Sequence, residues 1–241
     1  MNAHHPTPRN RLLAVLPAVD LALLQPSLEL VGLEARQILE VAHTPITNVY
    51  FVESGLVSVV GTTKPDHRIE VGMVGYEGMT GVGVALGDDQ SMNEALVQST
   101  GTAWRVAPPA LRKAMGASPT LTATLMRYVH IFIAQASQTA LANGRGKLDE
   151  RLARWLLMWH DRLRDDNLTI THEFLALLLG VRRQGVTVAL HDLEGKGLIK
   201  STRSLIRILD RDGLQRAANG FYGPPEAEYD RAIGLGERRT F

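Results

Sequence analysis

Cysteine is absent from the 241 residues of this chain. Its absence excludes disulfide bonds, thiolate zinc sites, iron–sulfur clusters held by cysteine, and a cysteine nucleophile. The sequence also lacks an apolar run long enough to cross a bilayer, and no charged-then-apolar leader opens it. We therefore expect a cytoplasmic protein that has no membrane partner.

A strong net charge is missing as well, because the formal charge at pH 7 is +1. The charges are nevertheless unevenly distributed. Residues 144–216 carry 14 lysines and arginines against 10 aspartates and glutamates, whereas residues 1–143 carry 9 against 11. Excess positive charge in one segment is typical of a surface that binds a polyanion. A nucleic-acid contact is therefore expected in residues 144–216.

Hydrophobic patterning divides the chain into five segments and predicts an α+β fold class. Short runs of β-branched and aromatic residues between glycine-rich turns are typical of a β-roll, or jelly roll. Within it, residues 48–63 predict two strands joined by a tight turn at Ser54 and Gly55. The expected segments are a disordered arm at 1–10, a β-roll at 11–119, a long helix at 120–143, a helical module with a hairpin at 144–216, and a flexible tail at 217–241.

The long helix carries apolar residues at steps of three and four, which place them on one face. These residues are Leu121, Leu125, Val129, Phe132 and Ala136. Packing on the β-roll explains one such stripe. Ile131 and Ile133 widen the apolar surface beyond it, and a second copy of the same helix is the simplest further partner. We therefore predict a homodimer whose dimerisation helix includes the five residues. The pair of glycines in "NGRG" (143–146) predicts the end of this helix.

The next segment has the order of a winged helix-turn-helix module. "KLDERLARWLLMWHDRL" and "LTITHEFLALLLG" predict helices, the second of which is capped by Thr171 and ended by Gly180. "VRRQGVTVALHDLEGKG" predicts another helix, and "LIKSTRSLIRILD" predicts a two-stranded hairpin. In such modules the second helix of the motif enters the major groove of DNA.

Polar side chains project from the first turn of that second helix, because Val186 and Leu190 occupy its inward face. Arginine pairs bidentately with guanine and glutamine pairs with adenine. The expected base-reading residues are Arg182, Arg183 and Gln184. Expected phosphate contacts come from the backbone at Gly185 and from the hairpin side chains Lys200, Arg203 and Arg207.

The stretch "LTITHEFLALLLGVRRQGVTVALHDLEGKGLI" resembles the winged helix-turn-helix signature of the Crp/Fnr superfamily of bacterial transcription regulators. Upstream, "VYFVESGLVSVV" and "VGMVGYEGMTG" resemble a cyclic-nucleotide-binding β-roll. The resemblance covers residues 10–216. It implies a homodimeric, sequence-specific regulator with a β-roll sensor domain, whose partners are double-stranded DNA, a second copy of itself and RNA polymerase.

The resemblance also implies roles for single residues. Arg183 and Gln184 fall on the Arg-Glu pair with which the family reads bases. Val188 falls where many members have a second base-reading arginine, so the preferred half-site is expected to differ from the best-known one. Three further residues are placed at phosphate contacts by the comparison: Thr171, His172 and Thr187.

The same comparison argues against binding of cyclic AMP. Members that bind it use a Gly-Glu pair and an Arg-Ser pair, and the second pair falls here on Asn93 and Glu94. A carboxylate at that position repels a cyclic phosphate. The effector of the sensor domain is therefore unknown, or there is none. The candidate residues of an effector pocket are Glu77, Gly78, Met79, Thr80 and Ser137.

No cofactor, metal site or catalytic residue is expected. Haem would need an axial ligand, and His43, His67 and His130 are interpreted as ordinary histidines. The spacing of serine, histidine and carboxylate residues matches no catalytic constellation, so an enzyme is not expected. The remaining alternative is a regulatory module whose winged helix binds a protein partner instead of DNA.

Overall fold

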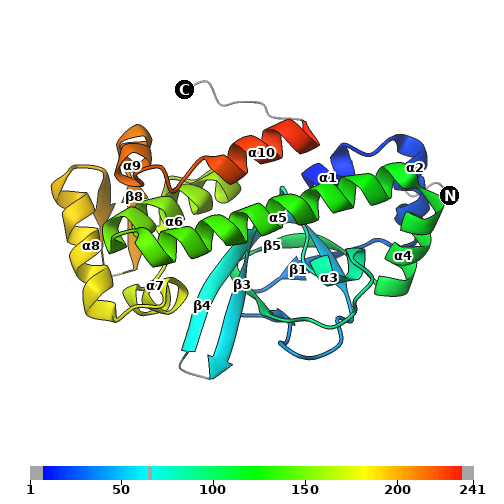
Figure 1. Cartoon of the computed structure of the whole chain (residues 1–241), viewed down its shortest axis with the longest axis horizontal. Coiled ribbons are helices and arrows are strands. Elements are labelled where there is room, and N and C mark those ends of the chain that lie inside the picture. Colours follow the sequence, from blue (N-terminus) through cyan, green and yellow to red (C-terminus); the bar gives the residue numbers. More distant parts are fainter. Residues whose placement is uncertain (1–7, 65–66, 203, 235–241) are drawn as a thin grey trace. The chain divides into compact units, whose positions relative to one another are not determined.

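The computed structural model describes residues 8–64, 67–202 and 204–234 of the chain (Figure 1). The chain divides into two compact units. Unit 1 comprises Met1–Val57, Val74–Ile131 and Tyr229–Phe241, and unit 2 comprises Ser58–Met73 and Phe132–Glu228. The predicted disordered arm falls almost entirely on residues 1–7, which lie outside the described residues.

Unit 1 is built on an antiparallel sheet. Its strands are ordered β1-β5-β3-β4, and β2 pairs with β5. The strands are β1 (Glu29–Leu33), β2 (Ile38–Glu40), β3 (Val49–Lys64), β4 (His67–Val74) and β5 (Glu94–Val106). The helices of this part are α1 (Arg11–Ala14), α2 (Ala18–Leu24), η1 (Gln25–Ser27), α3 (Val82–Ala85) and α4 (Pro108–Ala117). The part of β3 from Ser58 onward and all of β4 except Val74 belong to unit 2.

The predicted turn at Ser54 and Gly55 is wrong, because β3 runs through both residues as one 16-residue strand. Gly55 has a φ of +86°, and a Cβ atom there would lie 2.6 Å from the Ser99 carbonyl oxygen of β5. Glycine therefore marks a local irregularity and a close approach of two strands, and not a chain reversal.

The long helix α5 (Pro119–Arg145) contributes to the core of unit 1. Leu121, Leu125 and Val129 are buried there, at 4% exposure or less. The helix continues through Asn143 and Gly144 and ends two residues later than predicted. Leaving a solvent-exposed glycine in the last turn of a 27-residue helix costs only about 1 kcal/mol.

The C-terminal segment is not the flexible tail that its composition predicts, because Pro224–Ile233 form helix α10. Tyr229 and Ile233, which are four residues apart and on one face, join the core of unit 1. The Tyr229 hydroxyl donates a hydrogen bond to the Glu77 carbonyl oxygen (2.7 Å). Residues 235–241 of the predicted tail lie outside the described residues. At the other end, Asn10 is fully buried and caps α1, so the predicted arm ends before it.

Unit 2 contains the helical module and a three-stranded sheet ordered β6-β8-β7. Its elements are α6 (Leu148–Leu163), β6 (Asn167–Thr169), α7 (His172–Leu179), α8 (Arg183–Gly195), β7 (Ile199–Ser201), β8 (Leu205–Ile208) and α9 (Arg211–Ala217). Both helices of the predicted motif and the hairpin β7–β8 are confirmed. Strand β6 was not predicted, because three residues carry too little pattern to be recognised.

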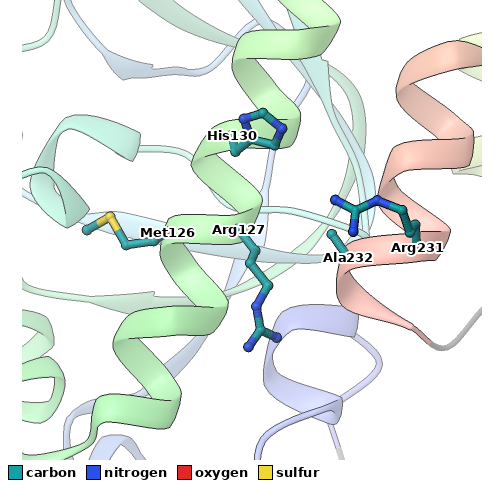
Figure 2. A pocket seen from close by; sticks show the side chains of 5 residues that line it. All are labelled: Met126, Arg127, His130, Arg231 and Ala232. Carbon is teal, nitrogen blue, oxygen red and sulfur yellow. The ribbon is translucent and has the colours of Figure 1, made fainter.

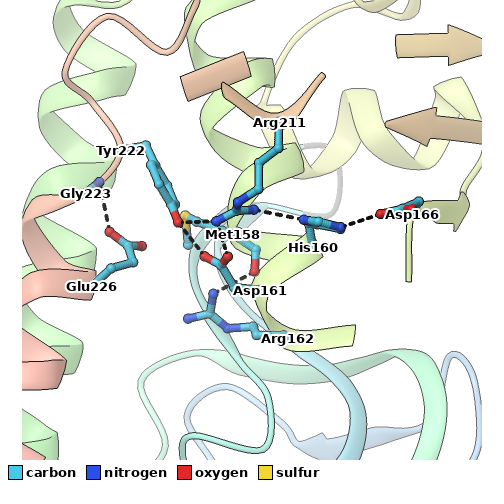
Figure 3. A network of polar contacts seen from close by, with 9 residues as sticks. All are labelled: Met158, His160, Asp161, Arg162, Asp166, Arg211, Tyr222, Gly223 and Glu226. Carbon is cyan, nitrogen blue, oxygen red and sulfur yellow. Dashed lines mark hydrogen bonds and ion pairs between the residues drawn. The ribbon is translucent and has the colours of Figure 1, made fainter. Parts of the chain in front are cut away.

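A polar network holds α9 and the start of the C-terminal segment on α6 (Figure 3). Arg211 contacts Asp161 (2.5 Å), His160 Nδ1 (2.8 Å) and the Tyr222 hydroxyl (2.8 Å). Tyr222 in turn donates to Asp161 (2.8 Å), and His160 Nε2 meets Asp166 (2.8 Å). Arginine can only donate, so Nδ1 of His160 accepts and Nε2 carries the proton toward Asp166. The network therefore orients the His160 ring between Arg211 and Asp166.

Within the described ranges, no helix is both long and apolar enough to cross a membrane.

Candidate nucleic-acid interface

The corner between α7 and α8 is formed by local backbone chemistry. Thr171 caps α7 by accepting a hydrogen bond from Phe174 N (3.2 Å). Gly180 ends the helix in the left-handed region (φ +64°), where only glycine is unstrained, and Val181 N donates back to Ala176 O (2.9 Å). The chain thus turns within three residues and begins α8 at Arg183.

The first turn of α8 presents the three predicted base-reading residues to solvent. Arg182, Arg183 and Gln184 are all exposed. Their side chains make no hydrogen bond or ion pair with the residues that the structure describes, whereas Val186, Leu190 and other apolar residues of the helix are buried. Guanidinium and amide groups held in this way remain available for a ligand that approaches this face.

His172 is held inside the motif rather than presented outward. Thr187 Oγ1 donates to Arg183 O (3.2 Å), which leaves its oxygen to accept from His172 Nδ1 (3.3 Å). The Nε2 atom is buried without a hydrogen-bond partner among the described atoms. Burial, followed by the positive charge of Arg183, lowers the pKa of His172. In this structure His172 and Thr187 thus link α7 and α8, and their predicted phosphate contacts stay a prediction.

Gly185 faces the protein as well. It is half-buried, and a Cβ atom there would lie 3.0 Å from Leu148 Cδ2 on α6. The absent side chain lets α6 and α8 pack closely. The predicted approach of the Gly185 backbone to a phosphate stays a prediction beside this packing role.

The hairpin places two cations side by side. Lys200 on β7 and Arg207 on β8 are direct partners in the antiparallel register, and both are exposed. Like charges opposite one another destabilise a sheet unless an anion is shared. Lys200 Nζ also contacts Glu194 Oε1 (3.2 Å), a pair that lowers the pKa of Glu194. Arg203, predicted for the tip, lies outside the described residues.

Among the predicted effector-pocket residues, Gly78 and Met79 lie against Tyr128 of α5. The Tyr128 hydroxyl donates to Met79 O (3.2 Å), and a Cβ atom on Gly78 would lie 2.1 Å from that hydroxyl. Met79 and Thr80 are buried. The Glu77 carboxylate accepts from Gly75 N (3.1 Å) instead of facing a ligand. Ser137, the fifth predicted residue, is exposed and belongs to the other unit.

Unit 1 has an open pocket of about 570 Å³ elsewhere (Figure 2). It lies between α5 and α10 and is lined by Met126, Arg127, His130, Arg231 and Ala232. Figure 2 shows the Arg231 guanidinium directed toward α5. The pocket is basic, but His130 and Arg231 already interact within the chain. We assign no ligand to it.

The five residues predicted for the dimerisation helix lie mainly against their own protomer. Leu121, Leu125 and Val129 are in the core of unit 1, and Phe132 and Ala136 are half-buried. The exposed apolar residues of α5 are instead Ile133 (56% exposed) and Leu141 (50%). The predicted role of the five residues in dimerisation stays a prediction, and Ile133 and Leu141 mark a second, exposed apolar face of α5.

Sequence reasoning missed a buried carboxylate in unit 2. Glu70 on β4 accepts hydrogen bonds from Ser58 Oγ (2.5 Å) and Trp155 Nε1 (2.9 Å). Burial raises the pKa of Glu70 from 4.5 to about 7, although these hydrogen bonds and the charges of Arg154 and Arg162 oppose the rise. No local sequence pattern predicts the contact between Glu70 and Trp155, because these two residues are 85 positions apart in the chain.

Comparisons with known proteins agree with this geometry. The family model described as a Crp-like helix-turn-helix domain matches residues 150–217. A solved Crp/Fnr-family transcriptional regulator from Eubacterium rectale is 19% identical, with a TM-score of 0.68 over 85% of this chain and 96% of its own. FixK2 from Bradyrhizobium japonicum is 19% identical, with a TM-score of 0.69 over 79% and 96%. Comparison with curated proteins gave no match.

A third solved structure has the same fold. TTHA1359, a Crp/Fnr-family regulator from Thermus thermophilus, is 21% identical, with a TM-score of 0.65 over 80% of this chain and 99% of its own. The predicted fold class is therefore confirmed: the chain has the fold of Crp/Fnr-family transcription regulators, and residues 150–217 form a Crp-like helix-turn-helix domain.

Proposed function

We propose that this chain, with its Crp-like helix-turn-helix domain and Crp/Fnr fold, is a homodimeric regulator that binds specific DNA sequences through α8 and the β7–β8 hairpin. Base contacts are made by Arg182, Arg183 and Gln184. Phosphate contacts are made by Lys200 and Arg207, with Thr171 and the Arg203 position as further candidates.

The observation that carries the proposal is the exposed, unpaired first turn of α8. Two arginines at a helix N-terminus oppose the helix dipole, so on a surface without a ligand they are unfavourable. Next to major-groove base edges they gain bidentate hydrogen bonds. The exposed cations Lys200 and Arg207 on the hairpin support the same ligand, because lysine and arginine are the usual phosphate contacts of DNA-binding proteins.

Binding to genomic DNA fragments tests this function. Gel-shift titrations are expected to show complexes whose affinity falls steeply as salt rises, since each neutralised phosphate releases condensed counterions. The alternative in which the winged helix binds a protein predicts no shift at any salt concentration. Such an absence, together with a stable complex of the chain with another protein, would replace the proposal.

A second copy of the chain is expected to pack on the exposed face of α5. The residues of this face in unit 2 are Ile133, Ser137, Ala140, Leu141 and Gly144. They recur at steps of three and four, which is the spacing of a two-helix seam, and small residues among them permit close approach. Twofold symmetry would also present two copies of α8 to one DNA duplex.

Replacing Ile133 with lysine should therefore convert the dimer into a monomer of 26.4 kDa, because it buries a charge in the seam. Size-exclusion chromatography with light scattering measures this mass. Leu86→Lys is the matched control, since Leu86 is equally exposed but lies at the end of α3. A dimer that persists in the Ile133 variant would exclude this face.

A further inference from the structure

Val188 is a large apolar residue exposed on α8, with 61% of its surface accessible. The other apolar residues of that helix, Val186, Ala189, Leu190 and Leu193, are buried. Residues two apart on a helix lie on nearly opposite sides, so burying Val186 and Leu190 turns Val188 outward. Nothing among the described residues covers it.

The position of Val188 relates it to the proposed base-reading turn. Gln184 lies four residues earlier and therefore on the same face of α8. Four residues advance the helix by about 6 Å, which compares with about 3.4 Å between base pairs. A helix whose first turn meets base edges thus brings Val188 within one or two base pairs of the base that Gln184 contacts.

Valine cannot donate or accept a hydrogen bond, so it contributes neither a phosphate contact nor a polar base contact. The major groove presents one apolar feature, the C5-methyl group of thymine. The β-branched side chain is also stiff at χ1, so little rotamer freedom is lost when it is placed against that methyl.

We propose that Val188 is a specificity-determining residue that selects thymine by contact with its C5-methyl group. The inference rests on the proposed DNA-binding function and deepens it, because it names one base of the preferred half-site. It explains why an apolar side chain is tolerated among Arg183, Gln184 and His191 on a solvent-facing surface.

Removing the thymine methyl tests the contact without changing base pairing. The preferred site is first obtained by sequencing DNA that the protein retains from a random pool. Each thymine of a half-site is then replaced singly by deoxyuridine, and affinity is measured by fluorescence anisotropy at constant salt. One position per half-site is expected to lose about fourfold in affinity, the value of burying one methyl-sized group.

Protein variants attribute the effect to Val188. In Val188→Ser the fourfold difference between thymine and deoxyuridine should disappear at that position, whereas Gln184→Ala should keep it. Because Val188 is exposed, its replacement is expected to leave the fold intact, and thermal melting by circular dichroism checks this.

Two results overturn the inference while leaving the proposed function intact: a preferred site in which no thymine is sensitive to its methyl, or sensitivity that persists unchanged in Val188→Ser. A failure to enrich any sequence would instead contradict the proposed function, and the inference with it.

Discussion

At pH 8, Glu70→Gln is expected to be more stable than the parent chain by about 3 kcal/mol, because a shift from 4.5 to about 7 spans more than two pKa units at ~1.4 kcal/mol each. Glu70 is buried, and its ionisation in the folded state is opposed by desolvation. Glutamine carries no charge, so its burial does not incur the desolvation cost of an ionised carboxylate. Its amide oxygen can still accept from Trp155 Nε1, and its amide nitrogen can donate to Ser58 Oγ.

The sign of the pH dependence follows from linkage. The folded state of the parent holds a proton on Glu70 between pH 4.5 and 7, where the unfolded state has lost it. The contribution of the neutral Glu70 carboxyl to the free energy of unfolding is thus fully present below pH 4.5 and is lost as pH rises through 7. The difference between the Glu70→Gln variant and the parent should be small at pH 4.5 and largest above pH 7.

Urea denaturation followed by circular dichroism at a series of pH values measures this difference. Glu34→Gln is the matched control, because it makes the same chemical change at an exposed loop position. A Glu70→Gln variant that is less stable than the parent at pH 8 would show that the ionised carboxylate, paired with Arg154 and Arg162, is the favoured form.

Arg183→Ala is expected to weaken binding to the preferred DNA site by about 1–3 kcal/mol, with little loss on random DNA. Arg183 opens α8 and is exposed, and its side chain makes no hydrogen bond or ion pair with the described residues, so its removal costs the fold little. What is lost is a bidentate base contact, and discrimination at one base pair of each half-site should relax.

Arg207→Ala provides the contrast. Arg207 lies on the hairpin opposite Lys200, where a phosphate contact is expected. Its removal should weaken specific and random DNA alike and reduce the slope of log affinity against log salt by about 1. Anisotropy titrations of both variants on both DNAs, at several salt concentrations, separate the roles. Equal losses on both DNAs for Arg183→Ala would remove it from the base-reading set.

The motif in unit 2 could be predicted from the sequence because its signals are local. The cap at Thr171, the glycine end at Gly180 and the apolar spacing of α8 all act within a few residues, and each was found where predicted. The roles of Gly185 and His172 could not be predicted, since both depend on residues brought near by folding: Leu148 for the first and Thr187 for the second.

In the sensor domain, even more of the structure depends on contacts between residues far apart in the sequence. Its strand texture indicated a β-roll, but the residue that lies against Gly78 and Met79, Tyr128, comes from α5, some 50 residues after Gly78. Helix α10 was mistaken for a flexible tail because Gly220 and Gly223 precede it and Pro224 and Pro225 begin it. The burial of Tyr229 and Ile233, which makes α10 part of unit 1, is a tertiary effect that composition does not reveal.

Sequencing of DNA that the purified chain selects from a random pool tests the central claim most directly. A dimer that places two α8 helices in successive major grooves predicts an enriched, twofold-symmetric motif with half-sites about one helical turn apart. The parent protein should enrich this motif, and Arg183→Ala should broaden it at one position per half-site. A pool with no enriched motif at any salt concentration would contradict sequence-specific DNA binding.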